Sequence, residues 1–224
     1  MFDFREFFGI YPERLLLGFG QTLYMVGIAL LVGTLIGVPL GFVLVITRPD
    51  GFSSHKAIYR ILNQLINIIR SIPFVILLIT IAPFTKLLIG TTIGSTAAIV
   101  PLTFYIVPYT ARMVEGPILE VNPGITEAAT SMGATTFQTI RYFLLPEAFP
   151  TIILSLTTCA IALISASTMA GTIGGGGIGD LAMTYGYQAM NTPLMILTVI
   201  ILILLVQIIQ TLGNALFIKV KKHS

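Results

Sequence analysis

Charged side chains are scarce in this chain: lysine, arginine, aspartate and glutamate make up only 9% of its 224 residues. A typical soluble domain carries about a quarter. So few charges cannot coat a water-soluble surface, and 55% of the residues are hydrophobic, so the composition predicts a protein whose solvent is the lipid bilayer. The net charge of +3 is small and gives no support to nucleic-acid binding.

Cysteine and histidine are also rare, and their scarcity excludes several kinds of site. The single cysteine, Cys159, excludes an internal disulfide. His55 and His223 lie outside the long apolar runs, so no histidine is available within the membrane for a Ser–His pair or a metal site. The sequence lacks the GxxxxGK[ST] phosphate-binding loop and is not expected to hydrolyse ATP itself. No catalytic residue, metal or cofactor is predicted, and an intramembrane enzyme is disfavoured.

Long apolar runs predict an all-α, polytopic membrane protein with five transmembrane helices, because a helix needs about 20 apolar residues to cross a bilayer. We treat residues 1–224 as one transmembrane domain. Gly33, Gly37 and Gly41 recur at a spacing that allows close helix packing in lipid. The second predicted span contains Arg70, which makes its ends the least certain. The predicted spans are about residues 20–46, 61–82, 87–112, 148–170 and 193–218.

The distribution of basic residues predicts the orientation of the chain, because cytoplasmic segments carry an excess of lysine and arginine. An N-terminus outside and a C-terminus in the cytoplasm leave only Arg5, Arg14 and Lys86 on the outer side. The same orientation places the polar segment 118–147 in the cytoplasm of a multi-pass protein of the plasma membrane. The basic residues then on the cytoplasmic side are Arg48, Lys56, Arg60, Arg112, Arg141, Lys219, Lys221 and Lys222.

The polar segment 118–147 is predicted to form two short helices around a tight turn. Asn122 is a good helix cap, and Pro123 suits the first helical position. Gly133 can adopt the left-handed conformation that ends a helix. The sequence from Thr135 to Gln138 fits a capping box at the start of the second helix. This compact shape suits docking of a partner protein, and an interfacial loop without a partner is the alternative.

Five residues of this segment are candidate partner contacts. Ala128 and Ala129 would let the backbone of a partner approach closely, and Glu127 offers a charge to a basic partner. Phe137 and Ile140 fall on one face of the second helix and can fill an apolar pocket.

The triplet Glu127-Ala128-Ala129, Gly133 and the pair Leu145-Pro146 together resemble the EAA loop of the membrane subunits of bacterial ABC importers. The family usually has isoleucine two residues before the leucine, where this chain has Phe143. The stretches RSIPFVILL, PYTARMVEG and MAGTIGGGGIGDLAMTYGYQ extend the resemblance over nearly the whole chain. They are similar to the permeases of methionine ABC importers.

This resemblance implies a permease subunit that translocates D- or L-methionine by alternating access, coupled to a separate ATPase. It implies a homodimer, two ATPase subunits and an extracytoplasmic methionine-binding lipoprotein. A permease for another small solute, such as a polar amino acid or a quaternary amine, and a non-transporting scaffold are the alternatives. The implied ATPase-coupling residues are Glu127, Ala128, Ala129, Gly133, Phe137, Ile140, Arg141, Leu145 and Pro146.

A glycine-rich run at 171–180 contains GxGxxG, but no strand precedes it and no acidic residue follows at the distance that dinucleotide binding needs. Irregular backbone at membrane depth is tolerated only when it is buried or lines a water-filled path. Gly174, Gly175 and Gly176 are therefore candidates for an outer gate, with a plain loop as the alternative. Small polar residues and a methionine end the fourth span and fit a pathway lining or ordinary helix packing: Ser165, Thr168 and Met169.

Overall fold

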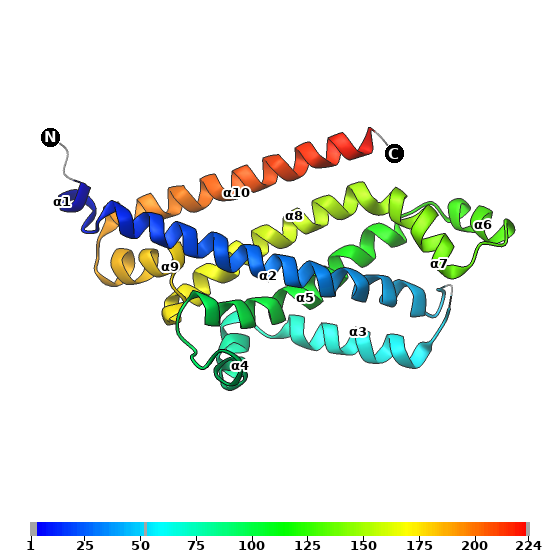
Figure 1. Ribbon diagram of the computed structural model, residues 1–224, viewed down its shortest axis with the longest axis horizontal. Helices are drawn as coiled ribbons and strands as arrows, with labels where there is room; N and C mark the ends of the chain where they lie inside the picture. Colours follow the sequence, from blue (N-terminus) through cyan, green and yellow to red (C-terminus); the bar gives the residue numbers. More distant parts are fainter. Residues whose placement is uncertain (1–3, 52, 223–224) are drawn as a thin grey trace. The chain divides into compact units, whose positions relative to one another are not determined.

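The computed structural model describes residues 4–51 and 53–222, and every element in these residues is a helix (Figure 1). The prediction of an all-α protein is confirmed. Three of the helices, named η, are π-helical. The elements are α1 (Phe4–Phe8), α2 (Pro12–Thr47), α3 (Lys56–Ser71), α4 (Phe74–Ile89), α5 (Ser95–Leu119), α6 (Pro123–Ser131), α7 (Thr136–Gln138), η1 (Thr139–Leu144), α8 (Leu145–Ala170), η2 (Gly171–Gly175), α9 (Gly177–Asp180), η3 (Leu181–Gln188) and α10 (Thr192–Lys221).

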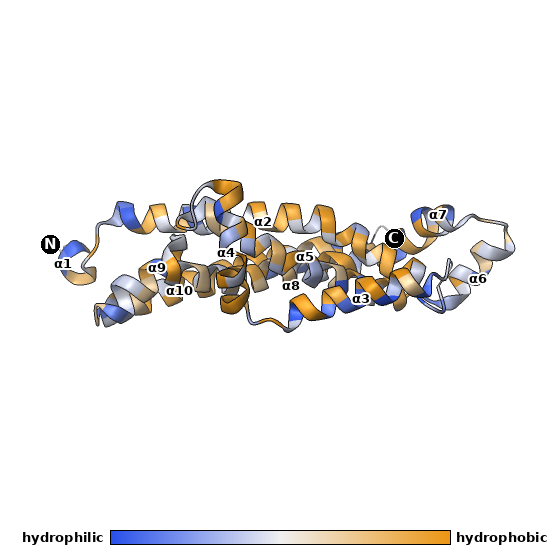
Figure 2. Ribbon diagram, turned by 90° about the horizontal axis from the view of Figure 1, so that it is seen from below, coloured by the Kyte–Doolittle hydropathy of each residue, from blue (hydrophilic) through white to orange (hydrophobic). Residues whose placement is uncertain are grey.

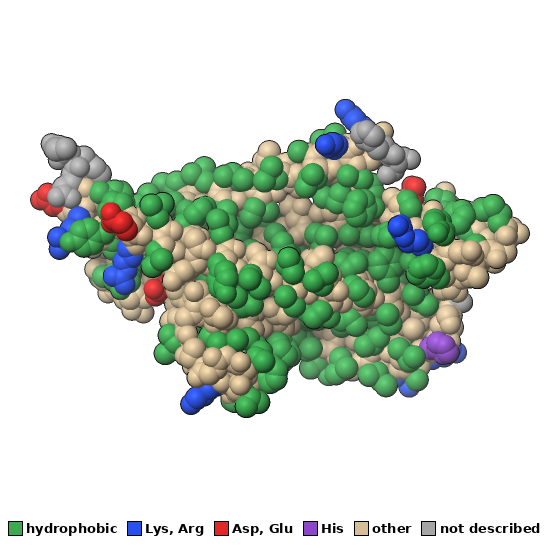
Figure 3. Space-filling view, viewed as in Figure 1, with side chains coloured by type: hydrophobic (Ala, Val, Ile, Leu, Met, Phe, Trp, Pro, Cys, Tyr) green, Lys and Arg blue, Asp and Glu red, His purple; other side chains and the backbone are tan. Residues whose placement is uncertain are grey.

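Four stretches of helix are long and apolar enough to cross a bilayer: α2, α5, the stretch Thr136–Gly175 that contains α8, and α10. The number of candidate spans in the described residues rises to five if α3 and α4 count as one broken span. Hydrophobic residues dominate α2 in Figure 2, and hydrophobic side chains are spread along the whole face drawn in Figure 3, where charged side chains lie mainly towards the two ends. These surfaces confirm the prediction of a polytopic membrane protein.

Two of the predicted spans have the wrong boundaries. Residues 61–82 are not one helix, because α3 ends at Ser71 and α4 begins at Phe74; a residue before proline is disfavoured in a helix, and Pro73 lies at this break. Residues 87–112 contain the end of α4, a turn, and the start of α5 at Ser95. Gly90, at φ 86°, closes α4 in the left-handed conformation. Because apolar residues flank the turn on both sides, hydropathy alone does not separate the two helices.

The chain forms two compact units, each assembled from three separate segments. The first contains the described residues up to Val32, Ile72–Ile106 and Ala160–Ile209. The second contains Gly33–Ser71, Val107–Cys159 and the described residues from Gln210 on. Four of the five boundaries fall inside α2, α5, α8 and α10, and the fifth lies between α3 and α4, so this division does not test the prediction of one domain.

In the first unit, polar side chains of α2 bind the glycine-rich chain that follows α8. The backbone N–H of Gly177 donates to Gln21 Oε1 at 2.9 Å, and that of Ile178 donates to Thr22 Oγ1 at 2.9 Å. These bonds satisfy N–H groups at the start of α9 that have no partner within the helix. The N-terminal end of α2 is fixed as well, because Arg14 donates to the Tyr185 hydroxyl in η3.

In the second unit, α2 and α5 approach so closely that only glycine fits on α2. A Cβ atom at Gly37 would lie 2.8 Å from Val107 O, and one at Gly41 would lie 2.8 Å from Ala111 O. The prediction of close packing is confirmed at Gly37 and Gly41, and the packing there lies within one subunit. The helix α3 packs against the same pair of helices through a cluster formed by Leu44, Ile66 and Ala111.

A charged group also joins α3 to α5 in this unit. Arg112 donates to Glu115 at 2.5 Å, which confirms the predicted pair, and also to the side-chain oxygens of Asn63 at 2.6 Å and Asn67 at 3.0 Å. Glu115 is 5% exposed, so its charge is buried, and its partner Arg112 is partly buried. Three acceptors around one guanidinium satisfy charges that burial alone would penalise.

The close contact at Gly41 predicts a change in stability when a single methyl group is added. We expect Gly41→Ala to lower the midpoint of thermal unfolding, because overpacking against the backbone of Ala111 costs about 1–3 kcal/mol, more than the helix-propensity gain of up to about 1 kcal/mol. The matched control is Gly27→Ala, also in α2, where a Cβ would meet nothing within 4 Å. Unfolding in detergent, followed by the monodisperse fraction after heating, measures both. Equal midpoints for the two variants would contradict the packing argument.

Candidate coupling site

The first helix of the segment 118–147 is fixed at both ends by local hydrogen bonds. Asn122 Oδ1 accepts from the backbone N–H of Gly124 at 2.9 Å, and Pro123 occupies the first turn. At the other end Gly133 has φ 74°, and its N–H donates to Thr130 O at 2.9 Å. The predicted cap, helix and glycine turn are confirmed.

The second helix starts with the predicted capping box. The backbone N–H of Thr135 donates to Gln138 Oε1 at 2.8 Å, and the N–H of Gln138 donates to Thr135 Oγ1 at 3.3 Å. From Thr136 the helical backbone continues through α7 and η1 into α8 without a break, as Figure 1 shows. The segment is therefore joined to the following long helix by a stiff connection.

One side of the segment is anchored in the hydrophobic core of the second unit. Leu144 is 2% exposed, and it packs in a cluster of buried residues from α2, α5, α8 and the chain between α5 and α6. Ile125 from α6 and Ile140 from η1 pack against the same cluster. The other buried members are Val45, Val114, Ile118, Val121, Ala148 and Ile152.

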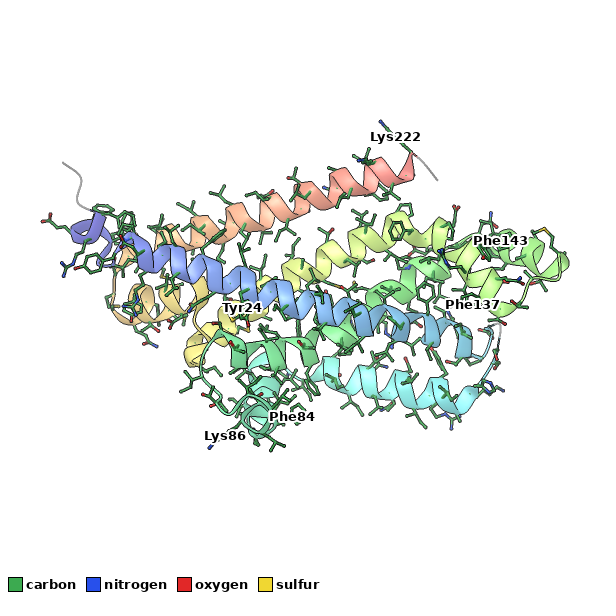
Figure 4. All side chains as sticks on the ribbon, viewed as in Figure 1. Tyr24, Phe84, Lys86, Phe137, Phe143 and Lys222 are labelled. Atoms are coloured by element: carbon green, nitrogen blue, oxygen red, sulfur yellow. The ribbon has the colours of Figure 1, made fainter. Side chains whose placement is uncertain are left out.

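The opposite side of the segment exposes large apolar side chains. Met132, Phe137 and Tyr142 are each about two-thirds exposed or more, at 67%, 72% and 66%. Glu127 and Ala128 are exposed beside them in the chain. Figure 4 labels Phe137 and Phe143 on the two short helices that follow Gly133. Several large exposed apolar side chains in one short segment, on a stiff support, suit a protein-docking surface.

Two predicted partner contacts face the chain's own core instead. Ala129 is fully buried, because it lies one helical turn after Ile125 on the inner side of α6, and Ile140 is partly buried in the cluster around Leu144. Ile140 keeps part of its surface exposed, and the contact of these two residues with a partner stays a prediction. Arg141 and Pro146 are exposed, and Leu145 is partly buried against the same cluster.

Sequence reasoning missed Met132 and Tyr142 as members of the exposed side. Met132 caps α6 immediately before the glycine turn, where no helix remains to cover its side chain. A large apolar residue at a helix end was the available signal. Tyr142 lies in a π-helix, whose wider turn moves side chains away from the positions that an α-helical spacing predicts.

The predicted pathway residues fall in the first unit. Ser165 and Met169 are exposed and one turn apart on α8, so they share a face, and Thr168 donates to Ser165 O at 2.7 Å. Gly174, at φ 86°, accepts from the N–H of Gly94 at 2.8 Å. The run is kinked: the backbone angles of Ile173 and Gly174 are not helical, Gly175 ends η2, and Gly176 caps α9.

A cavity of about 230 Å³ lies between α4, α5 and this glycine-rich end of the first unit. Gly175 lines it, together with Ala170, Ile173, Leu78 and Ala98. Its walls are mostly apolar, and Thr85 and Thr92 supply the hydroxyl groups. The structure thus brings Gly175 to a cavity but does not bring Ser165 or Met169 to it. The outer-gate and pathway roles stay predictions.

The turn at Gly133 predicts a large difference between two substitutions of similar size. A Cβ at Gly133 would meet nothing within 4 Å, so only the positive φ restricts the residue. We expect Gly133→Val to loosen the segment, whereas Gly133→Asn, which tolerates the left-handed conformation, should leave it ordered. Hydrogen exchange of residues 123–144 measures the effect. Equal protection in the two variants would contradict the role of this turn.

Known proteins are similar to this chain in sequence and in structure over 69% to 94% of its length. The probable D-methionine transport system permease protein of Vibrio cholerae is 50% identical over 94% of each chain. The D-methionine transport system permease protein of Escherichia coli K12 is 44% identical over 69% of this chain and 71% of its own. A chain of the inward-facing methionine ABC transporter MetNI has 41% identity and a TM-score of 0.91, covering 93% of this chain and 97% of its own.

A family model described as "Binding-protein-dependent transport system inner membrane component" matches residues 33–222. This range includes all four long apolar helices in whole or in part, and the complete segment 118–147. The chain therefore belongs to the family of inner membrane components of binding-protein-dependent transport systems.

Proposed function

We propose that this chain is the permease subunit of an ATP-driven methionine importer. The observation that carries the proposal is the exposure of Met132, Phe137 and Tyr142 on a segment that is anchored by Leu144 and continuous with α8. Membership of the transport family supports it, and so does the similarity to D-methionine permeases over 94% of the chain. This subunit forms the route for the solute across the membrane, and a separate ATPase subunit hydrolyses ATP.

Two copies of this chain form the solute route between them, each copy binds one ATPase subunit, and an extracytoplasmic methionine-binding lipoprotein delivers the solute. The similarity to a chain of MetNI supports this assembly. The N-terminus lies outside and the C-terminus in the cytoplasm, so residues 118–147 meet the ATPase in the cytoplasm. Arg141, exposed in this segment, adds to its basic cytoplasmic side.

Coupling follows from the stiffness of the segment. When the ATPase subunits close on ATP, they displace the exposed side chains Met132 and Phe137. The cap at Asn122, the capping box at Thr135 and the buried Leu144 prevent the segment from absorbing this displacement. The motion therefore reaches α8 and α5. The free energy for alternating access comes from the nucleotide cycle of the partner, because a ligand can shift an equilibrium only by its differential affinity for the two states.

The experiment that tests the proposal is copurification of the chain with its ATPase, followed by uptake of labelled amino acids into liposomes that contain ATP on the ATPase side. We expect ATP-dependent uptake of methionine that depends on the delivering lipoprotein. Stronger uptake of a polar amino acid or a quaternary amine would support the other solutes. Purification without an ATPase, or no ATP-dependent flux for any solute, would overturn the proposal.

The exposed apolar side predicts a selective loss of ATPase binding. We expect Phe137→Ser to weaken the affinity for the ATPase about 30-fold, because loss of a buried aromatic anchor at an interface costs about 2 kcal/mol or more. Leu35→Ser is the matched control, since Leu35 on α2 is exposed to a similar extent, at 67%, outside the segment. Titration of the purified ATPase against the permease in nanodiscs measures both. Similar losses in the two variants would remove Phe137 from the interface.

A further inference from the structure

The helix α3 exposes two faces of opposite character. Its apolar side chains Ile58, Ile61, Leu65 and Ile68 form a stripe, each between 46% and 60% exposed, which suits contact with lipid. A second exposed stripe is polar, and we call it the polar face of α3; Figure 2 shows both colours along this helix. Polar groups inside a membrane protein face water or other polar groups, because exposure to lipid is costly. The polar face consists of Gln64, Asn67, Arg70 and Ser71.

Arg112 lies beside this face, and its guanidinium is paired and hydrogen-bonded within the chain. Its guanidinium donates to Glu115, Asn63 and Asn67, and Glu115 supplies a compensating charge at 2.5 Å. Only about a quarter of the Arg112 side chain is exposed, at 23%. Arg112 therefore fixes the polar face against α5 and has little capacity left for a ligand.

Arg70 differs from Arg112 in every one of these respects. It lies one helical turn after Asn67 on the same side of α3, and its guanidinium carbon lies 5.7 Å from the centre of the Tyr109 ring on α5. Its side chain is exposed, and no carboxylate in the described part of the chain forms an ion pair with it. The aromatic ring supports the flat side of the guanidinium without neutralising its charge. Donor groups at its edge stay available for an acceptor.

The position of Arg70 along α3 separates it from charges at the membrane surface. Lys56 and Arg60 begin the helix and suit the level of the lipid headgroups. Arg70 follows Arg60 by ten residues, which is about 15 Å along a helix axis. Ionisable side chains at membrane depth usually face a water-filled cavity or a solute pathway, so Arg70 is a candidate contact for an anionic group on such a path.

We propose that Arg70 binds the carboxylate of an amino acid solute as the solute passes along the polar face of α3. A guanidinium pairs with a carboxylate through two parallel hydrogen bonds, which makes it suited to this recognition. The ring of Tyr109 holds the guanidinium of Arg70 in place. The charge of Arg112 is compensated by Glu115, so Arg70 is the anion-binding group of this site. This inference rests on the proposed function, because it names a site on the route of the same solute.

The polar face can be tested by thiol labelling, because the chain has a single native cysteine to replace. In a Cys159→Ala background, Gln64→Cys and Ser71→Cys each place a thiol on the polar face, and Leu65→Cys places one on the apolar face as a control. The complex with its ATPase is reconstituted in nanodiscs, and the labelling rate with a charged, membrane-impermeant methanethiosulfonate is measured. We expect labelling at residues 64 and 71 at least about tenfold faster than at residue 65. Equal rates at 64 and 65 would overturn the polar face as a water-filled path.

The role of the carboxylate is tested by adding solute directly. L-methionine should slow labelling of Ser71→Cys, whereas methionine methyl ester and methioninol, which lack the carboxylate, should not. Arg70→Gln should raise the methionine concentration for half-maximal protection at least about tenfold, the effect of losing a hydrogen bond to a charged group. Arg70→Lys should restore part of it, and Arg60→Gln should leave it within about twofold.

Three outcomes would overturn the proposal: equal protection by methionine and its methyl ester, unchanged protection in Arg70→Gln, or protection that follows the phosphatidylglycerol content of the nanodisc and not the solute. The last would assign Arg70 to a lipid headgroup. The comparison of methionine with its ester uses Arg70 itself and holds even if Arg70→Gln does not fold. ATP-driven methionine uptake by the unmodified complex is measured first, so its absence marks failure of the proposed function and not of this site.

Discussion

The burial of Leu144 is the contact on which the rest of the coupling site depends. This side chain lies where η1 passes into α8, and it packs with Val114 and Ile118 of α5 and Val45 of α2. A buried leucine in a close-packed core cannot shift far without opening a void, which makes this junction stiff. Because α6 is held to the same cluster through Ile125, a displacement of the exposed side of the segment moves the long helices together.

Glycine serves two different purposes in this chain, one in the segment 118–147 and one in the glycine-rich run after α8. In the segment 118–147 it turns the chain in open space, at Gly133. At the glycine-rich end of α8 it allows backbone to touch backbone: a Cβ at Gly171 would lie 2.4 Å from Asp180 N, and one at Gly179 would lie 2.4 Å from Thr168 Cα. The N–H groups freed by that tight return find acceptors in the side chains of α2, so no lipid-exposed polar backbone is needed there. Glycine thus ends a helix by a left-handed turn at one place and allows close backbone packing at the other.

The parts of the fold that the sequence predicts well are those with a local cause. The cap at Asn122, the turn at Gly133 and the capping box at Thr135 depend on residues within four positions of each other, and all three form as predicted. The inward orientation of Ala129 depends on the distant cluster that covers Ile125, which no local pattern reveals. The same holds for the π-helical geometry of η1, which changes the direction in which Tyr142 points.

The break between α3 and α4 shows a different limit of hydropathy. The window 61–82 is apolar on average, but the average combines two unlike helices. In α4 the apolar residues surround the whole helix, whereas α3 carries its polar residues on one side, from Lys56 to Ser71. A helix surrounded by lipid needs no such side, so the periodicity of α3 already conflicts with a lipid-embedded span. The polar side that makes α3 a poor span also forms a polar surface beside α5. On this surface Glu115 compensates the charge of Arg112, whereas Arg70 lies over the ring of Tyr109 and forms no ion pair with a carboxylate of the described residues. The asymmetry of charge along α3, more than the length of this helix, is the reason to propose a solute path at this face.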